Sequence, residues 1–412
     1  MAAPVVPDAE AGGGEGLARF GIRYTTAFTL YGAFSSAQVS RGIFIFYMLS
    51  HGVSLVEVGF VESCYQLARI VGEIPLGVLA DRWQRRGTVQ IGVAMHVLAA
   101  LMFIPGHGLV WFMVIFALLG GGAAAQSGAD VALLYDYLDG IGQEDRFAKV
   151  AGRAMASGYL ALSLGTAAGG PLGMIYGKLP FIAEAVLIGS SLLFVSMMPE
   201  PDHRSAQETD LGSWRTLGQA LAMVSRQPVL RTFVLFVALL EASTTVISIL
   251  SQGYLHNHGL SVTETSLALG FVTGLSAILS TQSHRLVKRG HSLGLGIAAA
   301  LYLSGLSIML IPGPIAAVVG FYLVFVNLDF LIPALQQFFN RLVTPDVRST
   351  TLSAQAFCAS AASLAAFPIA TAEIARHGYG VLTLGVLGVS LPVLFFIGIS
   401  AARRREVKEV PR

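Results

Sequence analysis

The sequence predicts an all-α membrane protein in which twelve transmembrane helices form two six-helix bundles. Three observations lead to this fold class. Of the 412 residues, 54% are hydrophobic and only 12% are charged, whereas about 25% of the residues in a typical soluble domain are charged. Apolar runs of the roughly 20 residues needed to cross a bilayer recur along the chain. One longer polar stretch, 199–227, divides these runs into six and six.

Short turns rich in glycine, proline and histidine, such as 105–108 and 312–314, separate the predicted spans. The spans lie near 24–49, 54–80, 88–105, 108–136, 149–174, 179–198, 228–255, 260–283, 291–311, 314–340, 349–375 and 379–401. They predict a disordered tail (1–23), an N-terminal bundle (24–198), a cytoplasmic linker (199–227), a C-terminal bundle (228–402) and a basic tail (403–412). In the linker, five apolar residues share one helical face and predict an amphipathic surface helix: Leu211, Trp214, Leu217, Leu221 and Val224.

Lysine and arginine are distributed very unequally between the two sides of the predicted helices. Twenty-two of the 26 lie in the tails and in the loops of one side. Only Lys178 and Arg376 lie on the other side, and Arg41 and Arg69 fall inside spans. Because cytoplasmic loops of membrane proteins carry the excess of positive charge, we expect both termini in the cytoplasm. The expected location is the cell (inner) membrane.

A short basic segment, 77–87, joins the second and third spans and reads G-V-L-A-D-R-W-Q-R-R-G. It resembles the loop between helices 2 and 3 of major facilitator superfamily transporters, roughly G-x-L-x-D-R-x-G-R-R-x, with Gln84 in place of a glycine. The stretch 284–290 aligns on 81–87 without gaps and keeps two arginines and the glycine. It lies in the equivalent loop of the second half, as expected when parallel repeats form two bundles.

This resemblance implies a latch at the cytoplasmic surface. Its residues would be Gly77, Asp81, Arg82, Arg86 and Asp136. Asp81 would face the start of span 11 when the transporter opens outward, where a helix N-terminus attracts an acidic group. A merely topogenic role for the arginines is compatible with the same residues.

Other motifs resemble one bacterial branch of the superfamily whose members are mostly labelled efflux permeases. They are 73–77, 132–136 and 348–353. The glycine-rich stretch 165–173 partly resembles the Gly/Pro motif of drug/proton antiporters, although close helix packing explains such glycines equally well. Span 4 lacks the arginine motif of many proton-coupled drug exporters, and 120–130 offers glutamine and aspartate instead.

Several ionisable side chains lie deep in the predicted spans. A charge at mid-bilayer costs about 2.5–3.5 kcal/mol, so it needs a partner, a wet cavity or a function. Glu62, Gln66, Arg69 and Glu73 form one polar stripe on span 2. We expect Glu62 to form a structural ion pair with Arg41, which lies at similar depth on span 1. The alternative is that Arg41 recognises an anionic group.

Two further expectations concern the same bundle. Arg69 pairs with Glu73 one turn away, or else with Asp130 of span 4. His96 on span 3 is expected to pack as a neutral side chain, and Glu184 near the outer end of span 6 is expected to be wetted.

The second half has deep acids but no deep arginine or lysine to match them. Glu241 lies on span 7 with Thr245 on the same face, and Asp329 lies on span 10 close to Asn327. A carboxylate without a cationic partner in low dielectric can exchange protons near neutral pH, which suggests proton coupling or a cationic substrate. The alternative is a protonated acid that is hydrogen-bonded inside the bundle. The candidate substrate or proton-coupling residues are Gln38, Arg41, Arg69, Gln126, Asp130, Glu241, Thr245, Asn327 and Asp329.

The resemblance implies a secondary active transporter that works by alternating access, and we expect proton-coupled export of a small organic molecule. One alternative is an importer or facilitator of a small, possibly anionic, metabolite read by Arg41 or Arg69. An alternative of a different class is a non-transporting receptor or a lipid flippase.

Other function classes find no support in the sequence. There is no P-loop, no G-x-S-x-G and no metal-ligand cluster, so neither an enzyme nor a cofactor or metal is expected, and a proton gradient is the expected energy source. The net charge of +2 gives no sign of nucleic-acid binding. Cys64 and Cys358 lie in apolar runs and are expected to be packing thiols. The expected partners are a small-molecule substrate and the lipid bilayer, and the expected state is a monomer.

Overall fold

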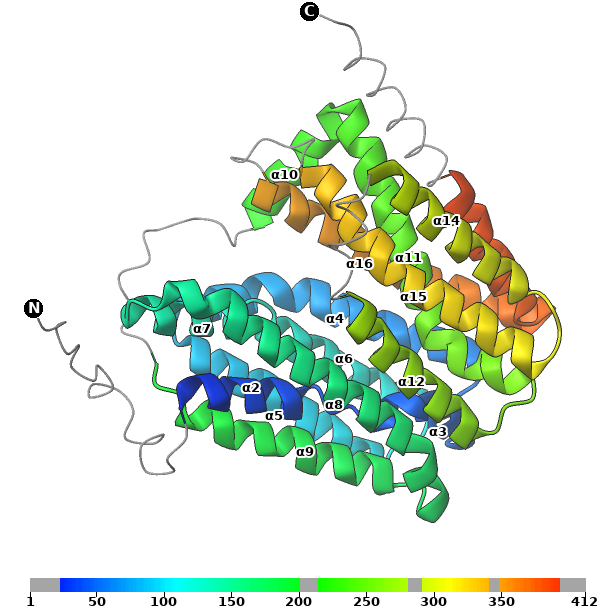
Figure 1. Cartoon of the computed structure of the whole chain (residues 1–412). Helices are drawn as coiled ribbons and strands as arrows, with labels where there is room; N and C mark the ends of the chain where they lie inside the picture. Colours follow the sequence, from blue (N-terminus) through cyan, green and yellow to red (C-terminus); the bar gives the residue numbers. More distant parts are fainter. Residues whose placement is uncertain (1–22, 201–213, 281–290, 341–347, 393–412) are drawn as a thin grey trace, which may run out of the picture.

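The computed structural model describes residues 23–200, 214–280, 291–340 and 348–392, and every element in these ranges is a helix (Figure 1). The first half contains α2 (Tyr24–Ser35), η1 (Ser40–Gly42), α3 (Phe44–Ser50), α4 (Leu55–Arg82), α5 (Arg85–Phe103), α6 (Leu109–Gln126), α7 (Ala129–Gly140), η2 (Glu144–Arg146), α8 (Phe147–Ile175) and α9 (Leu179–Met197). After α10 (Trp214–Arg226), the second half contains α11 (Pro228–Asn257), α12 (Val262–Ser280), α14 (His291–Ile308), α15 (Pro314–Asn340), α16 (Arg348–His377) and a helix over Gly380–Pro392. The all-helical prediction is confirmed.

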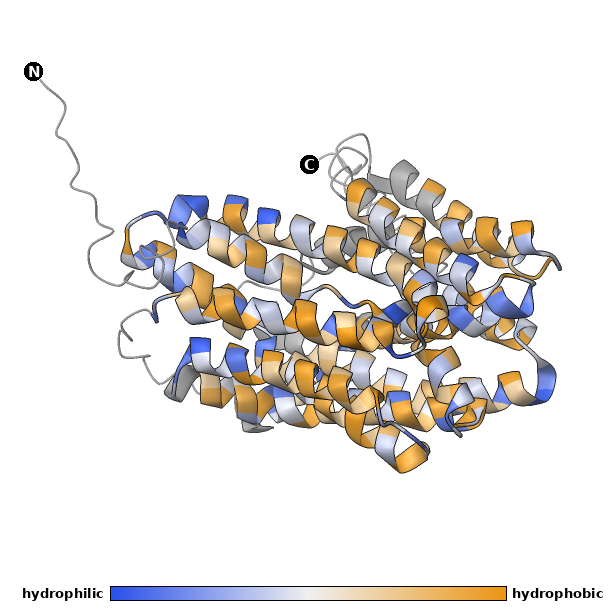
Figure 2. Ribbon diagram, turned by 90° about the horizontal axis from the view of Figure 1, so that it is seen from below, coloured by the Kyte–Doolittle hydropathy of each residue, from blue (hydrophilic) through white to orange (hydrophobic). Residues whose placement is uncertain are grey.

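Five helical stretches of the described chain are long and apolar enough to cross a membrane by length and composition. They are 85–103, 109–140, 179–197, 230–257 and 354–377. The helices are hydrophobic along most of their length and hydrophilic mainly at their ends (Figure 2). Each predicted span overlaps a helix, but the number of twelve membrane crossings stays a prediction.

The helices run up and down between two ends of the molecule. One end gathers the helix termini that carry Arg82, Arg85, Arg146 and Arg226, and we call it the basic end. The turns near 51–54, 104–108, 176–178, 258–261, 309–313 and 378–379 lie at the opposite end. In Figure 1 the helices of the two halves converge toward the opposite end and diverge toward the basic end.

Two capping boxes start equivalent helices of the two halves at the opposite end. Ser54 and Glu57 bond reciprocally at the start of α4, with the Ser54 backbone N–H donating to Glu57 Oε2 at 2.7 Å. Ser261 and Glu264 do the same before α12, with an identical distance of 2.7 Å. Each box satisfies backbone donors that the helix itself leaves free. The repeat that the sequence showed in the basic loops therefore has a structural counterpart at the other end.

Two predicted spans are interrupted in the structure. The span 24–49 is not one helix, because α2 stops at Ser35 and α3 begins only at Phe44. The span 108–136 breaks between α6 and α7, where Gly128 has a φ of 79°, which favours glycine. Both breaks leave backbone groups without helical partners, so other groups must satisfy them.

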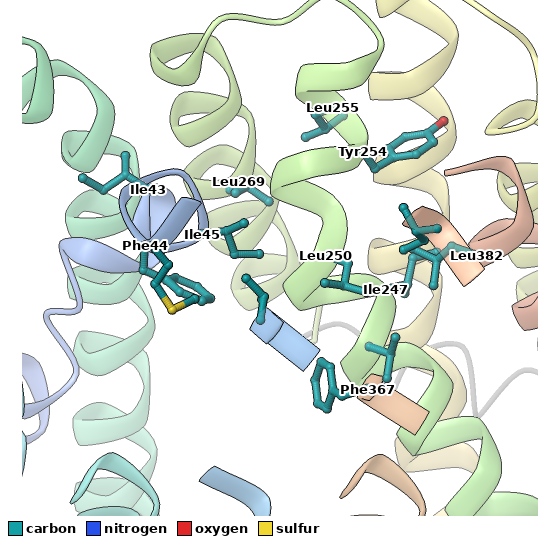
Figure 3. Packing of buried hydrophobic residues seen from close by; sticks show 14 of the residues in the cluster. Ile43, Phe44, Ile45, Ile247, Leu250, Tyr254, Leu255, Leu269, Phe367 and Leu382 are labelled. Atoms are coloured by element: carbon teal, nitrogen blue, oxygen red, sulfur yellow. The ribbon is translucent and has the colours of Figure 1, made fainter. Parts of the chain in front are cut away.

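The largest hydrophobic cluster joins the two halves near the opposite end. Figure 3 shows Ile43, Phe44 and Ile45 of the first half facing the α11 residues that include Ile247 and Leu250. A smaller cluster holds the first half together nearer the basic end, and a third unites α10, α11 and α16 around Val224 and Val234. The predicted linker helix is thus present as α10, and it packs on the second half.

Candidate functional site

A cavity of about 410 Å³ lies between the two halves. The first half contributes charged and polar walls from η1, α4, α5 and α9, and the second half contributes hydroxyl groups from α11. The charged and polar residues that the first half places in its wall include Gln38, Arg41, Glu62, Arg69, His96 and Glu184. Ligand sites in proteins typically have volumes of about 300–1,000 Å³, so the cavity has room for a small organic molecule.

Arg41 reaches the cavity from the break between α2 and α3, and residues from both halves hold the broken backbone. The Gln252 side-chain amide donates to the Arg41 carbonyl at 2.8 Å, and its oxygen accepts from the Ile45 N–H at 3.3 Å. On the other side, Glu184 Oε2 accepts from the Ser40 N–H at 2.6 Å. The buried Gln252 amide and the buried Glu184 carboxylate thus replace hydrogen bonds that a continuous helix would have made. They hold the backbone around Arg41 in place.

The prediction that Glu184 is wetted is wrong, because its side chain is buried. Its depth suggested an exposed position near the start of α9, at the opposite end of the molecule. The break between α2 and α3 instead offers a free backbone N–H at that level, and the carboxylate turns inward to accept from it.

Arg41 and Glu62 both line the cavity, but they do not form the predicted ion pair among the described contacts. The expectation assumed two straight helices at matching depth, whereas Arg41 lies in η1, within the break. Glu62 and Glu184 both act electrostatically on the Arg41 guanidinium without bonding to it. Glu62 is only 4% exposed, and its Oε1 is buried without a hydrogen-bond partner in the described structure. An unpartnered buried carboxylate oxygen is costly, so this group needs a proton, a ligand or a movement.

Arg69 lines the same cavity two turns further along α4, and its guanidinium makes no ion pair with a described residue. Its predicted partner Glu73 is not among the cavity residues, so the polar stripe in the wall does not extend to that position. The alternative partner Asp130 is turned to the start of α7, where its Oδ1 accepts from the Val131 N–H at 2.7 Å. The break before α7 explains this, because it creates a helix N-terminus that attracts an acid.

His96 links the cavity to a polar chain inside the first half. Its Nδ1 lies 2.9 Å from the Gly92 carbonyl and 3.1 Å from Gln126 Nε2. Gln126 Oε1 in turn accepts from the Tyr31 hydroxyl at 3.3 Å. Gln126 therefore supports a wall residue and does not line the cavity itself. Sequence reasoning did not place His96 or Glu184 in a site, although each is an ionisable residue in an otherwise apolar segment.

The polar face predicted for α11 divides between two environments. Thr245 and Ser248 line the cavity, whereas Glu241 is half-buried and accepts from Gln355 Nε2 of α16 at 3.1 Å. Glu241 is not among the cavity residues. Asn327 is buried and donates to its own helix at the Leu323 carbonyl, 2.7 Å away. The Asp329 side chain lies outside the described residues.

A smaller cavity of about 180 Å³ adjoins the first. Five residues line both cavities: Arg41, Phe44, Ser248, Ile249 and Phe325. Beyond them, the smaller cavity extends between α8, α11, α12 and α15. Its own walls are apolar groups, hydroxyls and one amide, contributed by Tyr159, Leu162, Thr166, Gln252, Leu269, Val272, Thr273, Ser276 and Phe321.

The two halves contact each other closely beside these cavities and on their opposite-end side. The Ser63 hydroxyl donates to the Leu364 carbonyl at 2.7 Å, which joins α4 to α16. The Ser163 hydroxyl donates to the Gly270 carbonyl at 2.8 Å, which joins α8 to α12. Nearer the end, the Gly170 N–H donates to Ser266 Oγ at 3.0 Å. The glycine-rich stretch 165–173 therefore works as a close-packing device, because α8 there meets both the α2–α3 break and α12.

Residues 25–368 match the family model described as Major Facilitator Superfamily. The chain belongs to this superfamily. It is also 23% identical over 383 residues to an uncharacterized MFS-type transporter of Methanocaldococcus jannaschii, a match that covers 92% of this chain and 88% of the relative. Membership makes the chain an integral membrane transporter and not an enzyme.

Solved structures of transporters share the fold. A variant of the nucleoside transporter NupG matches with a TM-score of 0.76 and 14% identity, over 90% of this chain and 97% of that one. A D-xylose-proton symporter matches with a TM-score of 0.65 and 12% identity, over 90% and 95%. A POT family transporter in complex with 5-aminolevulinic acid matches with a TM-score of 0.66 and 14% identity, over 97% and 98%. At these identities the likeness concerns the fold.

The loop that resembles the superfamily latch lies at the basic end. Asp136 of α7 pairs with Arg85 of α5, an arginine that was not among the predicted latch residues. Arg86 instead donates to the Met198 carbonyl at 2.8 Å. The side chains of Asp81 and Arg82 lie outside the described residues, so their latch role stays a prediction. A Cβ placed on Gly77 would meet no described atom within 4 Å.

Glu200 is a member of this cluster that sequence reasoning missed. Its carboxylate accepts from the Arg85 N–H at 2.9 Å and from the Arg86 N–H at 3.0 Å. These are the first two residues of α5, so Glu200 caps that helix from more than a hundred residues away. The signal in the sequence was an acid between two prolines directly after span 6. The contact ties the end of α9 to the latch loop.

Proposed function

We propose that the protein is a proton-coupled secondary transporter that exports a small organic molecule by alternating access. The cavity between the halves is the proposed substrate site, and Glu62 is the proposed proton-carrying residue. One observation carries the proposal: Glu62 combines a buried, unpartnered carboxylate oxygen with a place in the cavity wall. Glu62 takes the place of Glu241 as the first candidate, because Glu241 bonds to Gln355 away from the cavity. The Asp329 side chain lies outside the described residues, so its role in proton coupling stays a prediction.

The surroundings of Glu62 favour reversible protonation. The ionisable groups that face it are Arg41 from η1, Tyr65 and Arg69 from α4, His96 from α5 and Glu184 from α9. None of these described groups hydrogen-bonds to Glu62. A carboxyl group that is neither bridged to a cation nor wetted from bulk can take up and release a proton as the cavity changes its access. Such a change would let one proton accompany each reorientation.

Alternating access is supported by the uneven contact between the halves. Hydrogen bonds between described residues of the two halves lie beside the cavities or on their opposite-end side. Rocking of two bundles around a central site is the general mechanism of transporters with this repeat architecture. In the conformation described, the site would therefore be reached from the basic end, which the lysine and arginine distribution predicts to be cytoplasmic.

The exporting direction rests on the motifs that resemble efflux permeases. The competing direction is uptake of an anionic metabolite, which the two cavity arginines favour. Flux in proteoliposomes under an imposed pH gradient distinguishes the two. The outside of the vesicles is acidified in both cases. Loss of preloaded substrate from the vesicles supports export in exchange for protons, whereas accumulation of substrate inside the vesicles supports symport with protons. Absence of flux in either direction would favour a receptor.

Glu62→Gln tests the coupling residue directly. We expect gradient-driven flux to fall at least about tenfold because the amide cannot carry a proton, while exchange of labelled against unlabelled substrate at equal pH persists. The matched control is Gln66→Ala, one turn away on the same stripe, in which the pH dependence should keep its midpoint. An unchanged pH dependence in Glu62→Gln would remove Glu62 from the mechanism.

A further inference from the structure

Two half-buried arginines in the cavity wall have no hydrogen-bonded acidic partner among the described residues. Arg41 and Arg69 line one cavity, and neither guanidinium forms an ion pair or a hydrogen bond with a described residue. A guanidinium presents five donors in a plane that fits carboxylate or phosphate oxygens. Each half-buried guanidinium has lost part of its hydration without gaining a described protein partner, which is costly. The two side chains are therefore available to acceptors that the described protein does not provide.

The two cavity carboxylates do not bond to these guanidiniums among the described contacts. Glu184 already accepts from the Ser40 N–H at 2.6 Å and supports the break that carries Arg41. Glu62 bonds to neither arginine among the described contacts, and in the proposed function it is the group that carries the proton. Neither carboxylate therefore occupies the donors of the two guanidiniums, which stay available on the cavity side. A carboxylate or phosphate is the ligand that matches these donors.

The adjoining cavity indicates the chemistry of the rest of the ligand. Among its lining residues, Arg41 alone is charged at neutral pH. Thr166, Thr273 and Ser276 offer hydroxyl groups, and Phe321 and Leu269 offer apolar surface. The Thr166 Oγ1 is buried and has no hydrogen-bond partner in the described structure. This environment suits an uncharged part of a ligand with at most a few hydroxyl or carbonyl groups.

We infer that the substrate is a small organic anion: its carboxylate or phosphate binds between Arg41 and Arg69, and its uncharged part enters the cavity lined by Thr166, Thr273 and Ser276. Arg41 lies at the junction because it lines both cavities. The inference rests on the proposed function only in taking this cavity as the substrate site. It holds for either direction of transport.

The test is ligand-induced thermal stabilisation of the purified full-length protein. The probes are a panel of aromatic and hydroxylated carboxylates and organic phosphates. Each acid is compared with a neutral counterpart, its amide or alcohol, and with a cationic counterpart, the amine of the same carbon skeleton. We expect acids to raise the melting temperature and the neutral and cationic counterparts to leave it unchanged. In Arg41→Gln and Arg69→Gln, acid affinity should fall at least about tenfold, which is about 1.4 kcal/mol. The control Arg153→Gln removes an exposed arginine from α8 and should bind acids normally.

A further variant tests whether the uncharged part of the ligand lies in the smaller cavity. Ser276→Leu narrows the smaller cavity, so it should weaken binding of the larger acids about tenfold and leave acetate and inorganic phosphate unaffected. Equal stabilisation by the neutral or cationic members, no stabilisation by any acid, or unchanged acid binding in both arginine variants would overturn the inference. Glu62→Gln separates the two proposals: acid binding that survives there without proton-driven flux supports the anion site even if the coupling scheme fails.

Discussion

The two ends of α4 differ sharply in how they meet the rest of the molecule. Near the opposite end, a Cβ on Gly59 would lie 2.8 Å from the Phe367 carbonyl oxygen and 2.9 Å from Pro368 Cα of α16. Near the basic end, a Cβ on Gly77 would meet no described atom within 4 Å. Both glycines lie on one helix, and described atoms of the second half lie close to it at Gly59 and more than 4 Å from the Gly77 position. The molecule is closed on one side of its cavity, and no described atom packs against Gly77 of the latch loop on the other.

The polar contacts at the opposite end also differ in kind from those at the basic end. At the opposite end, side chains of one half bond to backbone of the other, as Gln252 and Ser63 do. At the basic end, Arg85–Asp136 and the Glu200 cap join elements of the first half to each other. The first kind must break when the access changes, whereas the second can move as one body. The largest effects of substitution should therefore come from the opposite end.

Gly59→Val should have the largest effect. The added carbons cannot fit beside Phe367 and Pro368 without separating α4 from α16, so the opposite end should stay open and net transport should fall at least about 100-fold. Thiol labelling of a cysteine placed in that interface, together with flux, measures the change. Gly152→Val is the matched control, since a Cβ there meets open space. Normal flux in Gly59→Val would mean that this contact does not form in the working cycle.

Gly77→Val should also block net transport, but by preventing closure at the basic end. The conformation described here has room for the side chain, so folding and ligand binding should remain close to wild type. The engaged state of the latch, which the superfamily resemblance implies, should be excluded, and flux should fall at least about tenfold. Ligand affinity and flux measured on the same preparation distinguish this outcome. Affinity lost together with flux would contradict it.

Gln252→Leu should have an intermediate effect. It keeps the size of the side chain and leaves the Arg41 carbonyl and the Ile45 N–H without partners, each at a cost of about 1–3 kcal/mol when buried. We expect the closed opposite end to be less populated and ligand affinity to fall several-fold, because Arg41 is less well positioned. Gln355→Leu, which removes an amide bonded within the second half, is the control. A Gln252→Leu protein that binds and labels like wild type would assign this side chain no role in closure.

Asp136→Asn should have the smallest effect. Its pair with Arg85 is partly exposed, at 34% and 23% for the two side chains, and such pairs contribute roughly 0–1 kcal/mol. Thermal unfolding should shift by a few degrees at most, and transport should change less than twofold. A large loss of stability would show that the pair anchors the latch loop far more than its exposure suggests.

Much of the fold followed from the sequence because long apolar segments and arginine-rich loops are local signals. The helices, the linker helix α10 and the polar stripe on α4 belong to this group. The break that presents Arg41 was not predictable, because its backbone groups are satisfied by Glu184 and Gln252 from distant helices. Straight-helix geometry therefore placed Arg41 against Glu62 and predicted a pair that does not form among the described contacts.

The cavity itself was only partly predictable. Gln38, Arg41, Arg69 and Thr245 were identified from their types and depth, and they do line it. The orientation of each helix about its own axis decided which other polar residues reach the cavity. Glu241 faces Gln355 instead of the cavity, whereas Glu184 and His96 face the cavity. One sequence carries no information on rotation when a helix is apolar on nearly every face.

The central claim is that the halves close one end at a time around the cavity. Pulsed electron paramagnetic resonance tests it most directly, with Cys64 and Cys358 replaced by serine and label pairs at exposed positions. One pair, Gln143 and Arg231, spans the basic end, and the other, Tyr176 and Asn257, spans the opposite end. In Gly59→Val we predict that the opposite-end distance lengthens while the basic-end distance shortens. Two outcomes would contradict the account: distances that change in the same direction at both ends, and distances that do not change at either end.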